Sequence, residues 1–230
     1  MPSLHIVNNK LYRYLPLITR WGAFAIAIVS LLLLNSLEWS KALVWSGLLV
    51  LSWITAVFIL RKAIISYTLT STHFHQQFDK GGWLLRWQDI AAIELCTYSQ
   101  QGWRTPLPWI GIRLKDHSHF LNAICPRITT DILMSQRALL YLGFKQMKEE
   151  NQEWESKEFE DVILDSSEYT DRSGVRYTGL KAMMANRMRY QRQFHGFDLF
   201  LSTSDLDRSG EEFVGLLRRY LAAAQPIEFK

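Results

Sequence analysis

The sequence has only two cysteines, Cys96 and Cys125, among its 230 residues. A disulfide framework needs several paired cysteines, so that class of domain is excluded, and two free thiols fit a reducing compartment. No Cys-x-x-Cys pair or Cys/His set occurs at zinc-ligand spacing. His73 and His75 would share one face of a strand, but no third ligand stands at a helpful spacing. We therefore expect no metal ion and no other cofactor.

The sequence also lacks familiar enzyme motifs. It contains no glycine-rich phosphate loop, no Gly-x-Ser-x-Gly and no His-Glu-x-x-His. The neighbouring carboxylates Glu211 and Glu212 begin a predicted helix, where acidic side chains are stabilised. We assign no catalytic residue, and the sequence favours a protein that is not an enzyme, although an unfamiliar active site needs none of these motifs.

Charged side chains are missing from two long apolar runs near the start of the chain. Trp21 to Leu37 and Ala42 to Leu60 contain no Asp, Glu, Lys, Arg or His. Neither run has the polar stripe of a soluble helix, and both are close to the length that crosses a hydrocarbon core of ~30 Å. We predict a membrane hairpin over residues 1–62, with helices at about 17–37 and 42–60. The lack of charge disfavours a transporter, because no side chain offers an ion path.

Basic residues flank the hairpin on its outer sides and predict its orientation. These topology-setting residues are Lys10, Arg13, Arg20, Arg61 and Lys62. The link between the runs carries one lysine and one glutamate, so the positive-inside rule places both termini in the cytoplasm. A cleaved signal peptide is excluded because no small-residue cleavage site follows the first run and a second run comes at once. We therefore predict a multi-pass membrane protein, with the lipid bilayer as its first partner.

The net charge of +4 is unevenly distributed along the chain. Residues 1–62 carry six Lys or Arg against one Glu, whereas residues 63–230 carry 20 basic against 21 acidic residues. The basic character thus belongs to the membrane flanks, where it meets anionic lipid. A nucleic-acid partner is not expected, because the remaining domain has no excess of positive charge.

Residues 63–230 are long enough for one ordinary domain, and their pattern mixes strands and helices. Strands are predicted at about 64–69, 73–78, 83–87, 90–98, 109–114 and 197–202. Helices are predicted at about 126–142, at 180–194 and after the capping residue Ser209. Between the first two helices, residues 149–171 carry ten acids against one lysine, which predicts a mobile or weakly ordered connector.

Two segments carry a resemblance to a known class of domain. Trp87-Gln88-Asp89-Ile90-Ala91-Ala92-Ile93 follows the second strand of a predicted hairpin, and Gly196-Phe197-Asp198-Leu199-Phe200-Leu201 precedes Asp205-Leu206 and the last helix. Together they resemble bacterial membrane-anchored PH-like domains, and the chain is similar to an uncharacterised inner-membrane family of gammaproteobacteria. The resemblance implies an α+β fold: a PH-like antiparallel β domain after the hairpin, with a helical insertion at about 126–194 and a C-terminal capping helix. It implies no activity.

Arg187 is the most informative charged residue of the domain. On a helical wheel it falls within the apolar stripe formed by Met183, Met184 and Phe194. A buried guanidinium stays charged, so it needs a carboxylate or several carbonyl groups. We predict a buried ion pair, for which the candidate partners are Asp198, Asp205 and Asp207. The alternative is that Arg187 binds a phosphate or carboxylate of a ligand.

A second candidate surface lies on the opposite side of the same helix. Lys181, Arg189 and Arg192 point away from the apolar stripe, and Trp103 lies near a proline-bracketed loop. These side chains could contact anionic lipid or a protein partner; the bases could instead bind the acidic connector, and the tryptophan could be buried. The sequence thus favours a membrane-anchored interaction or scaffolding module. The alternative is an enzyme that acts on a lipid or envelope precursor at the cytoplasmic membrane face.

Overall fold

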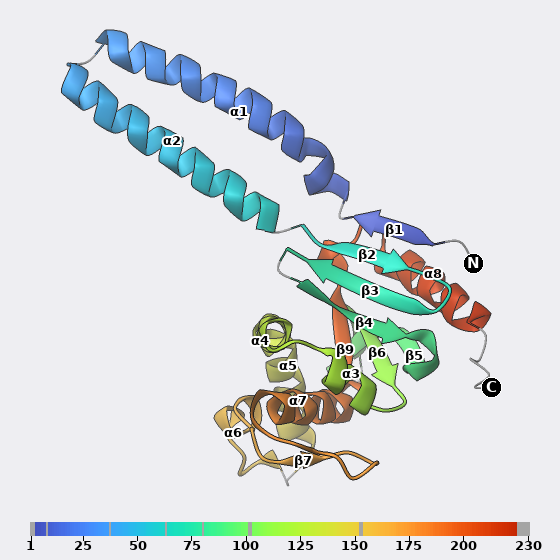
Figure 1. The fold of residues 1–230 in the computed structure, drawn as a ribbon. Coiled ribbons are helices and arrows are strands. Elements are labelled where there is room, and N and C mark those ends of the chain that lie inside the picture. Colours follow the sequence, from blue (N-terminus) through green and yellow to red (C-terminus); the bar gives the residue numbers. More distant parts are fainter. Residues whose placement is uncertain are drawn as a thin grey trace.

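Two long helices project from a mixed α+β domain in the computed structural model (Figure 1). The structure describes residues 3–7, 9–36, 38–62, 64–79, 81–100, 103–151 and 154–224. The side chains of Lys10, Arg13, Lys62 and Trp103 lie outside the described part of the chain. The α+β class predicted from the sequence is confirmed, with the two apolar helices first and antiparallel sheets and further helices after them.

Helices α1 (Asn9–Ser36) and α2 (Trp39–Lys62) correspond to the two predicted apolar runs. Each contains a stretch of 23 residues, Tyr14–Ser36 and Trp39–Arg61, that is long and apolar enough to span a membrane by length and composition. Although proline disfavours the interior of a helix, α1 continues through Pro16. Proline removes only one backbone donor, and the rigid φ angle of its ring is compatible with a helix.

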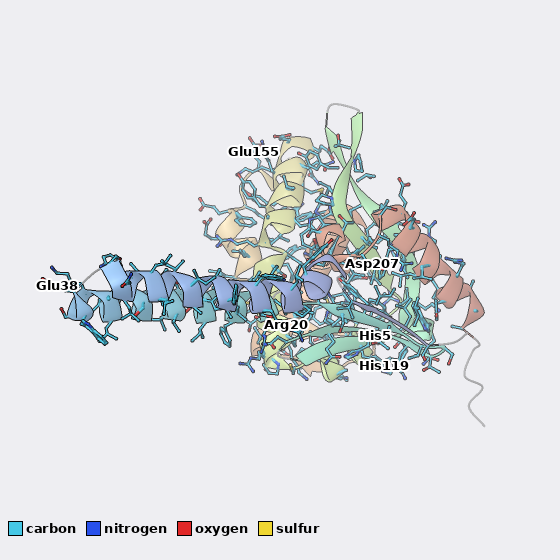
Figure 2. The ribbon with its side chains drawn as sticks, turned by 90° about the horizontal axis from the view of Figure 1, so that it is seen from above. His5, Arg20, Glu38, His119, Glu155 and Asp207 are labelled. Carbon is cyan, nitrogen blue, oxygen red and sulfur yellow. The ribbon has the colours of Figure 1, made fainter. Side chains whose placement is uncertain are left out.

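The two helices lie side by side along their length (Figure 1). A Cβ atom placed on Gly22 would lie 2.0 Å from the ring of Trp53, so the indole packs directly against the glycine backbone. Small residues at such positions let helices approach closely. At the tip, Lys41 Nζ lies 3.0 Å from a carboxylate oxygen of Glu38, whereas Arg20 lies near the domain (Figure 2).

A four-stranded antiparallel sheet begins before the helices and continues after them. Its strands, in spatial order, are β1 (Leu4–Val7), β2 (Ser66–Leu69), β3 (His73–Phe78) and β4 (Gly81–Arg86). Leu4 is opposite Leu69, and Val7 is opposite Ser66. Strand β1 was not predicted from the sequence. Its pairing brings the chain that enters α1 next to the chain that leaves α2.

A second, three-stranded antiparallel sheet has the order β5 (Ile90–Gln100), β6 (Trp103–Leu114) and β9 (Leu199–Ser202). The last helix, α8 (Gly210–Ala223), packs against this sheet and against the aromatic core of the other. Phe213 contacts Tyr67 with ring centroids 5.4 Å apart, and Tyr220 stacks on Trp87 at 5.9 Å. The predicted start of this helix is confirmed, because Ser209 Oγ accepts a hydrogen bond from the Glu212 backbone N–H.

An insertion between β6 and β9 supplies the remaining elements. They are α3 (Ser118–Ala123), α4 (Pro126–Ser135), α5 (Arg137–Glu150), α6 (Phe159–Ile163), the hairpin of β7 (Tyr169–Thr170) and β8 (Arg176–Tyr177), and α7 (Gly179–His195). The predicted single helix at 126–142 is wrong, because Gln136 separates α4 from α5. The buried Gln136 side chain donates to the Phe200 carbonyl at 3.2 Å and accepts from Gln191 at 3.1 Å. These buried bonds fix the residue between the two helices.

The acidic stretch at 149–171 is more structured than its composition predicted. Trp154 is 2% exposed and packs against Phe144 and Phe194, with ring centroids 6.0 and 5.1 Å apart. Helix α6 follows and begins with a capping box formed by Glu158 and Asp161. The expectation of a weakly ordered connector is therefore corrected for residues 149–151 and 154–171. The acids lie mostly on the surface, while a few apolar side chains anchor the segment to the domain.

Two glycines of the domain should respond to alanine in opposite directions. A Cβ atom on Gly111 in β6 would lie 2.3 Å from the Phe197 ring, so Gly111→Ala is expected to destabilise the domain by about 1–3 kcal/mol through overpacking. Gly215 in α8 has open space around it, so Gly215→Ala is expected to stabilise the domain by about 1 kcal/mol. Urea unfolding of the two variants measures both changes, and equal effects would contradict the packing seen at Gly111.

Candidate functional site

A buried polar cluster surrounds Asp198, which stands directly before β9 and has no exposed surface. One carboxylate oxygen accepts from Arg192 Nε at 2.6 Å and lies 3.0 Å from His117 Nε2. The other accepts from Arg192 Nη2 and from the Leu114 backbone N–H, the latter at 2.7 Å. On its far side, His117 Nδ1 lies 3.2 Å from the hydroxyl of Tyr169. The cluster thus joins β6, α3, α7 and the start of β9.

The donors around Asp198 stabilise its ionised form. Burial raises the pKa of this carboxyl, but the hydrogen bonds from His117 and Arg192 outweigh burial and hold the pKa below its usual range. Both oxygens of Asp198 and both ring nitrogens of His117 are occupied by these contacts. A general base must reach a substrate proton, and these groups already bond to one another. The geometry therefore describes a structural connection between four segments.

Asp198 was one of three candidate partners for Arg187, but it pairs with Arg192. Arg192 was predicted to face outward with Lys181 and Arg189, but its guanidinium binds Asp198 and also donates to the Leu114 carbonyl at 2.8 Å. The physical reason is position along α7. Arg192 lies in the last turn of the helix, which runs into Gly196 and then straight to Asp198. An arginine six residues before an aspartate can reach it across the end of the helix.

The other two predicted acids also have different surroundings. Asp207 forms an ion pair with its neighbour Arg208, with 2.8 Å between Oδ1 and Nε. Burial raises the pKa of Asp205, which lies in a short turn after β9. Asp205 and Asp207 therefore do not meet Arg187. The geometry accounts for both acids without a ligand.

The remaining bases of the predicted surface do not form one basic face. Arg189 Nη2 lies 3.6 Å from a carboxylate oxygen of Asp165, and its guanidinium lies over the ring of Tyr190. Asp165 belongs to the acidic stretch and also accepts from the Tyr190 hydroxyl at 2.7 Å. Lys181 is half-buried at the start of α7. Of the two alternatives for these bases, the structure places Arg189 against the acidic stretch.

Arg187 is 2% exposed and has no carboxylate partner among the residues that the structure describes. Its Nη1 donates to the Leu133 carbonyl at 3.2 Å, and its Nη2 donates to the Ile163 carbonyl at 3.1 Å. Its Nε is buried without a hydrogen-bond partner. Burial, with a smaller contribution from the nearby charge of Arg137, lowers the pKa of Arg187 to about 10. The guanidinium therefore remains charged near neutral pH with its charge uncompensated.

Beside Arg187 lies a groove of about 350 Å³ between α4, α6 and the first turns of α7. Figure 1 shows these helices gathered on the side of the domain away from α8. The apolar side chains that line the groove are Leu133, Met134, Ile163, Leu164, Leu180 and Met183. Arg137 and Glu160 also line it, and both are exposed. This volume falls within the ~300–1,000 Å³ of small-molecule sites, and the lining suits an apolar ligand with a charged end.

Several residues of these two sites have no local signal in the sequence. His117 contacts Asp198, which is 81 residues away along the chain, and Tyr169 contacts His117 across 52 residues. No local spacing predicts such a meeting. The groove requires the relative placement of three helices, which periodicity alone does not supply. Within the described ranges, no group of three His, Cys, Asp or Glu side chains could hold a metal ion.

The chain was compared with known proteins by family, by sequence and by structure. No match was found among curated proteins or among solved structures. Residues 67–223 match a family model described as "Protein of unknown function (DUF2982)". This range starts within β2 and ends with α8, so it covers both larger sheets apart from β1 and the first residue of β2, together with the inserted helices and the groove beside Arg187. The match includes more than half of the chain, and the protein belongs to the DUF2982 family.

Proposed function

We propose that this protein is a membrane-anchored interaction module, in which α1 and α2 span a bacterial inner membrane and a PH-like domain lies at the cytoplasmic face. The observation that carries the proposal is the exposure of the two apolar helices. Leu31 and Leu51 are 70% and 61% exposed, and neither candidate span is buried against the domain. Apolar surface of this extent is not stable in water, and a bilayer would cover it.

The base of the helix pair supports the proposed topology. Strands β1 and β2 are hydrogen-bonded neighbours, so the segments before α1 and after α2 lie on the same side of the pair. Arg61 stands at this end of α2 and Arg20 lies in the half of α1 nearer to it, while the other end carries the Glu38–Lys41 pair. By the positive-inside rule, the end with the basic excess would face the cytoplasm.

The arrangement of the sheets supports the PH-like part of the proposal. A four-stranded and a three-stranded antiparallel sheet are followed by the amphipathic helix α8, which packs on the core. The last strand and helix have the order that the resemblance implies. The departure is the insertion from α3 to α7, which carries the groove beside Arg187.

The surroundings of Arg187 favour binding over catalysis. A polar pocket with converging acids would suit an enzyme, because proton transfer needs carboxylates or histidines near the substrate. The groove instead has mainly apolar walls, and Glu160 is the acidic side chain that lines it. The buried cluster at Asp198 has its acceptors occupied by internal donors. These features suit a domain that holds a ligand or partner unchanged.

The native cysteines offer a direct test of the topology. Cys125 is exposed, whereas Cys96 is buried, and burial raises the pKa of its thiol to about 12, so it should not react with a maleimide near neutral pH. A membrane-impermeant maleimide added to intact spheroplasts should leave Cys125 unlabelled and should label it after permeabilisation. In a Cys125→Ser background, Ser40→Cys at the helix tip should be labelled in intact spheroplasts. Labelling of Cys125 without permeabilisation would contradict the proposed orientation.

A further inference from the structure

The groove beside Arg187 combines three properties. Its walls are apolar, a buried and uncompensated guanidinium lines it, and two apolar side chains stand exposed around it. These two are Met134 and Leu164, which are 68% and 65% exposed. Exposed apolar side chains of this size are scattered thinly over the rest of the domain, where the others are Leu84, Tyr141 and Val175 among the described residues. The two most exposed large apolar side chains among the described residues of the domain therefore both line the groove.

The guanidinium has capacity for an anion. Arginine carries five N–H donors, and two of the nitrogens of Arg187 each donate to one carbonyl. Nε has no partner, and leaving a buried charged donor unsatisfied is costly. Arg137 and Glu160 line the same groove and both are exposed, so solvent screens both charges, whereas the charge of Arg187 is buried. The groove thus carries two positive charges against one negative charge.

We infer that this groove binds a single-chain lipid with an anionic head group, whose acyl chain lies along the apolar walls and whose head group binds Arg187. The inference rests on the proposed function, since it names the ligand class of the membrane-anchored domain. The uncompensated charge of Arg187 favours an anionic ligand, because a neutral lipid would leave the guanidinium without a counter-charge. The apolar walls of the groove favour a ligand with an acyl chain, because a free phosphate or carboxylate ion would leave these walls in contact with water.

Photolabelling of the full-length protein tests this inference. The chain is placed in nanodiscs of neutral phosphatidylcholine and irradiated with dodecanoate that carries a terminal diazirine. We expect saturable labelling of peptides from α4, α6 or the start of α7. Unlabelled dodecanoate or dodecyl phosphate should compete, and the stronger competitor identifies the head group as a carboxylate or a phosphate. Dodecanol should compete roughly tenfold less well, since it lacks the charge that a charge-assisted hydrogen bond needs.

Two variants and one matched control locate the site. Arg187→Gln removes the charge and should weaken labelling roughly tenfold or more. Met183→Trp fills the groove while leaving the guanidinium in the protein, and it should block labelling even if Arg187→Gln fails to fold. Arg189→Gln alters an outward arginine of the same helix and should leave labelling unchanged. Circular dichroism verifies the fold of each variant.

Three results would overturn the inference: no saturable labelling, equal competition by dodecanol, or full labelling of a folded Met183→Trp variant. Each of these is distinguishable from failure of the proposed function. A chain that enters the nanodisc but is not labelled in the groove retains its membrane anchor. A chain that stays out of the nanodisc contradicts the anchor itself.

Discussion

Arginine at the middle of both long helices, as in Phe24→Arg combined with Leu51→Arg, is expected to remove the protein from the membrane fraction. Both side chains are mostly exposed, at 60% and 61%, so in a bilayer they would face lipid. An arginine at the centre of a membrane helix costs about 2.5–3.5 kcal/mol on insertion scales, so two cost about 5–7 kcal/mol. The fraction of protein that remains in membranes after an alkaline carbonate wash measures the effect.

The matched control is Val175→Arg, which places the same charge on an exposed apolar side chain of the domain. This variant should stay in the washed membranes, because its side chain already faces water in the turn between β7 and β8. If the double variant also remained there at the wild-type level, α1 and α2 would not be surrounded by lipid. The proposal of a membrane anchor would then be wrong.

Replacing Asp198 by asparagine is expected to lower the free energy of unfolding of the domain by about 3 kcal/mol. The amide keeps the shape but leaves Arg192 without a counter-charge. In the wild type the Leu114 N–H and Arg192 Nε donate to the two oxygens of Asp198. In the variant, the amide NH2 group would face one of these donors. The estimate lies at the lower end of the ~3–5 kcal/mol range for broken buried pairs, because the Arg192 side chain is 32% exposed. Urea unfolding in detergent, followed by tryptophan fluorescence, measures the change.

Asp207→Asn is the control for this change, because it removes one member of a partly exposed pair with Arg208. Such pairs contribute about 0–1 kcal/mol, so the control should unfold close to the wild type. If both variants lost the same stability, the cluster at Asp198 would not connect its four segments as the structure indicates.

Asp198 should also make the free energy of unfolding of the domain depend on pH in the acidic range. The folded-state pKa of Asp198 is lowered, so its contribution is present above the unfolded-state pKa of about 3.9 and is lost as pH falls below it. Wild-type stability should therefore fall more steeply than that of Asp198→Asn below pH about 4. Urea unfolding at several pH values from 3 to 7 measures both slopes, and identical slopes would show that Asp198 is not selectively ionised in the fold.

Local patterns of sequence were sufficient for the elements whose formation depends on their own residues. The two apolar helices follow from uninterrupted hydrophobic runs, strand β3 has the predicted bounds of 73–78, and Ser209 caps α8 as its spacing with Glu212 indicated. In each case the interactions that decide the structure lie within a few residues or with solvent. Periodicity and capping chemistry describe such interactions directly.

Features that depend on distant residues could not be predicted in this way. Strand β1 has four residues, and what makes it a strand is pairing with β2, which follows two helices. Arg187 is buried, which agrees with its place in the apolar stripe on the helical wheel. The wheel does not show which part of the protein packs over that stripe. The covering atoms are backbone carbonyls of Leu133 and Ile163, which have no signature in a sequence. For the same reason, Asp198 was named only as one of three candidate partners of Arg187, and its pairing with Arg192 was not predicted.

The pairing of β1 with β2 also constrains how the protein is made. The ribosome completes Leu4–Val7 long before Ser66–Leu69, so the first strand must wait while both helices emerge. If α1 alone crossed the bilayer, β1 and β2 would lie on opposite sides of the membrane, and the sheet would lack its outer strand. In the proposed topology, β1 and β2 can pair only when both helices have crossed the bilayer, so insertion of the hairpin would have to precede completion of the sheet.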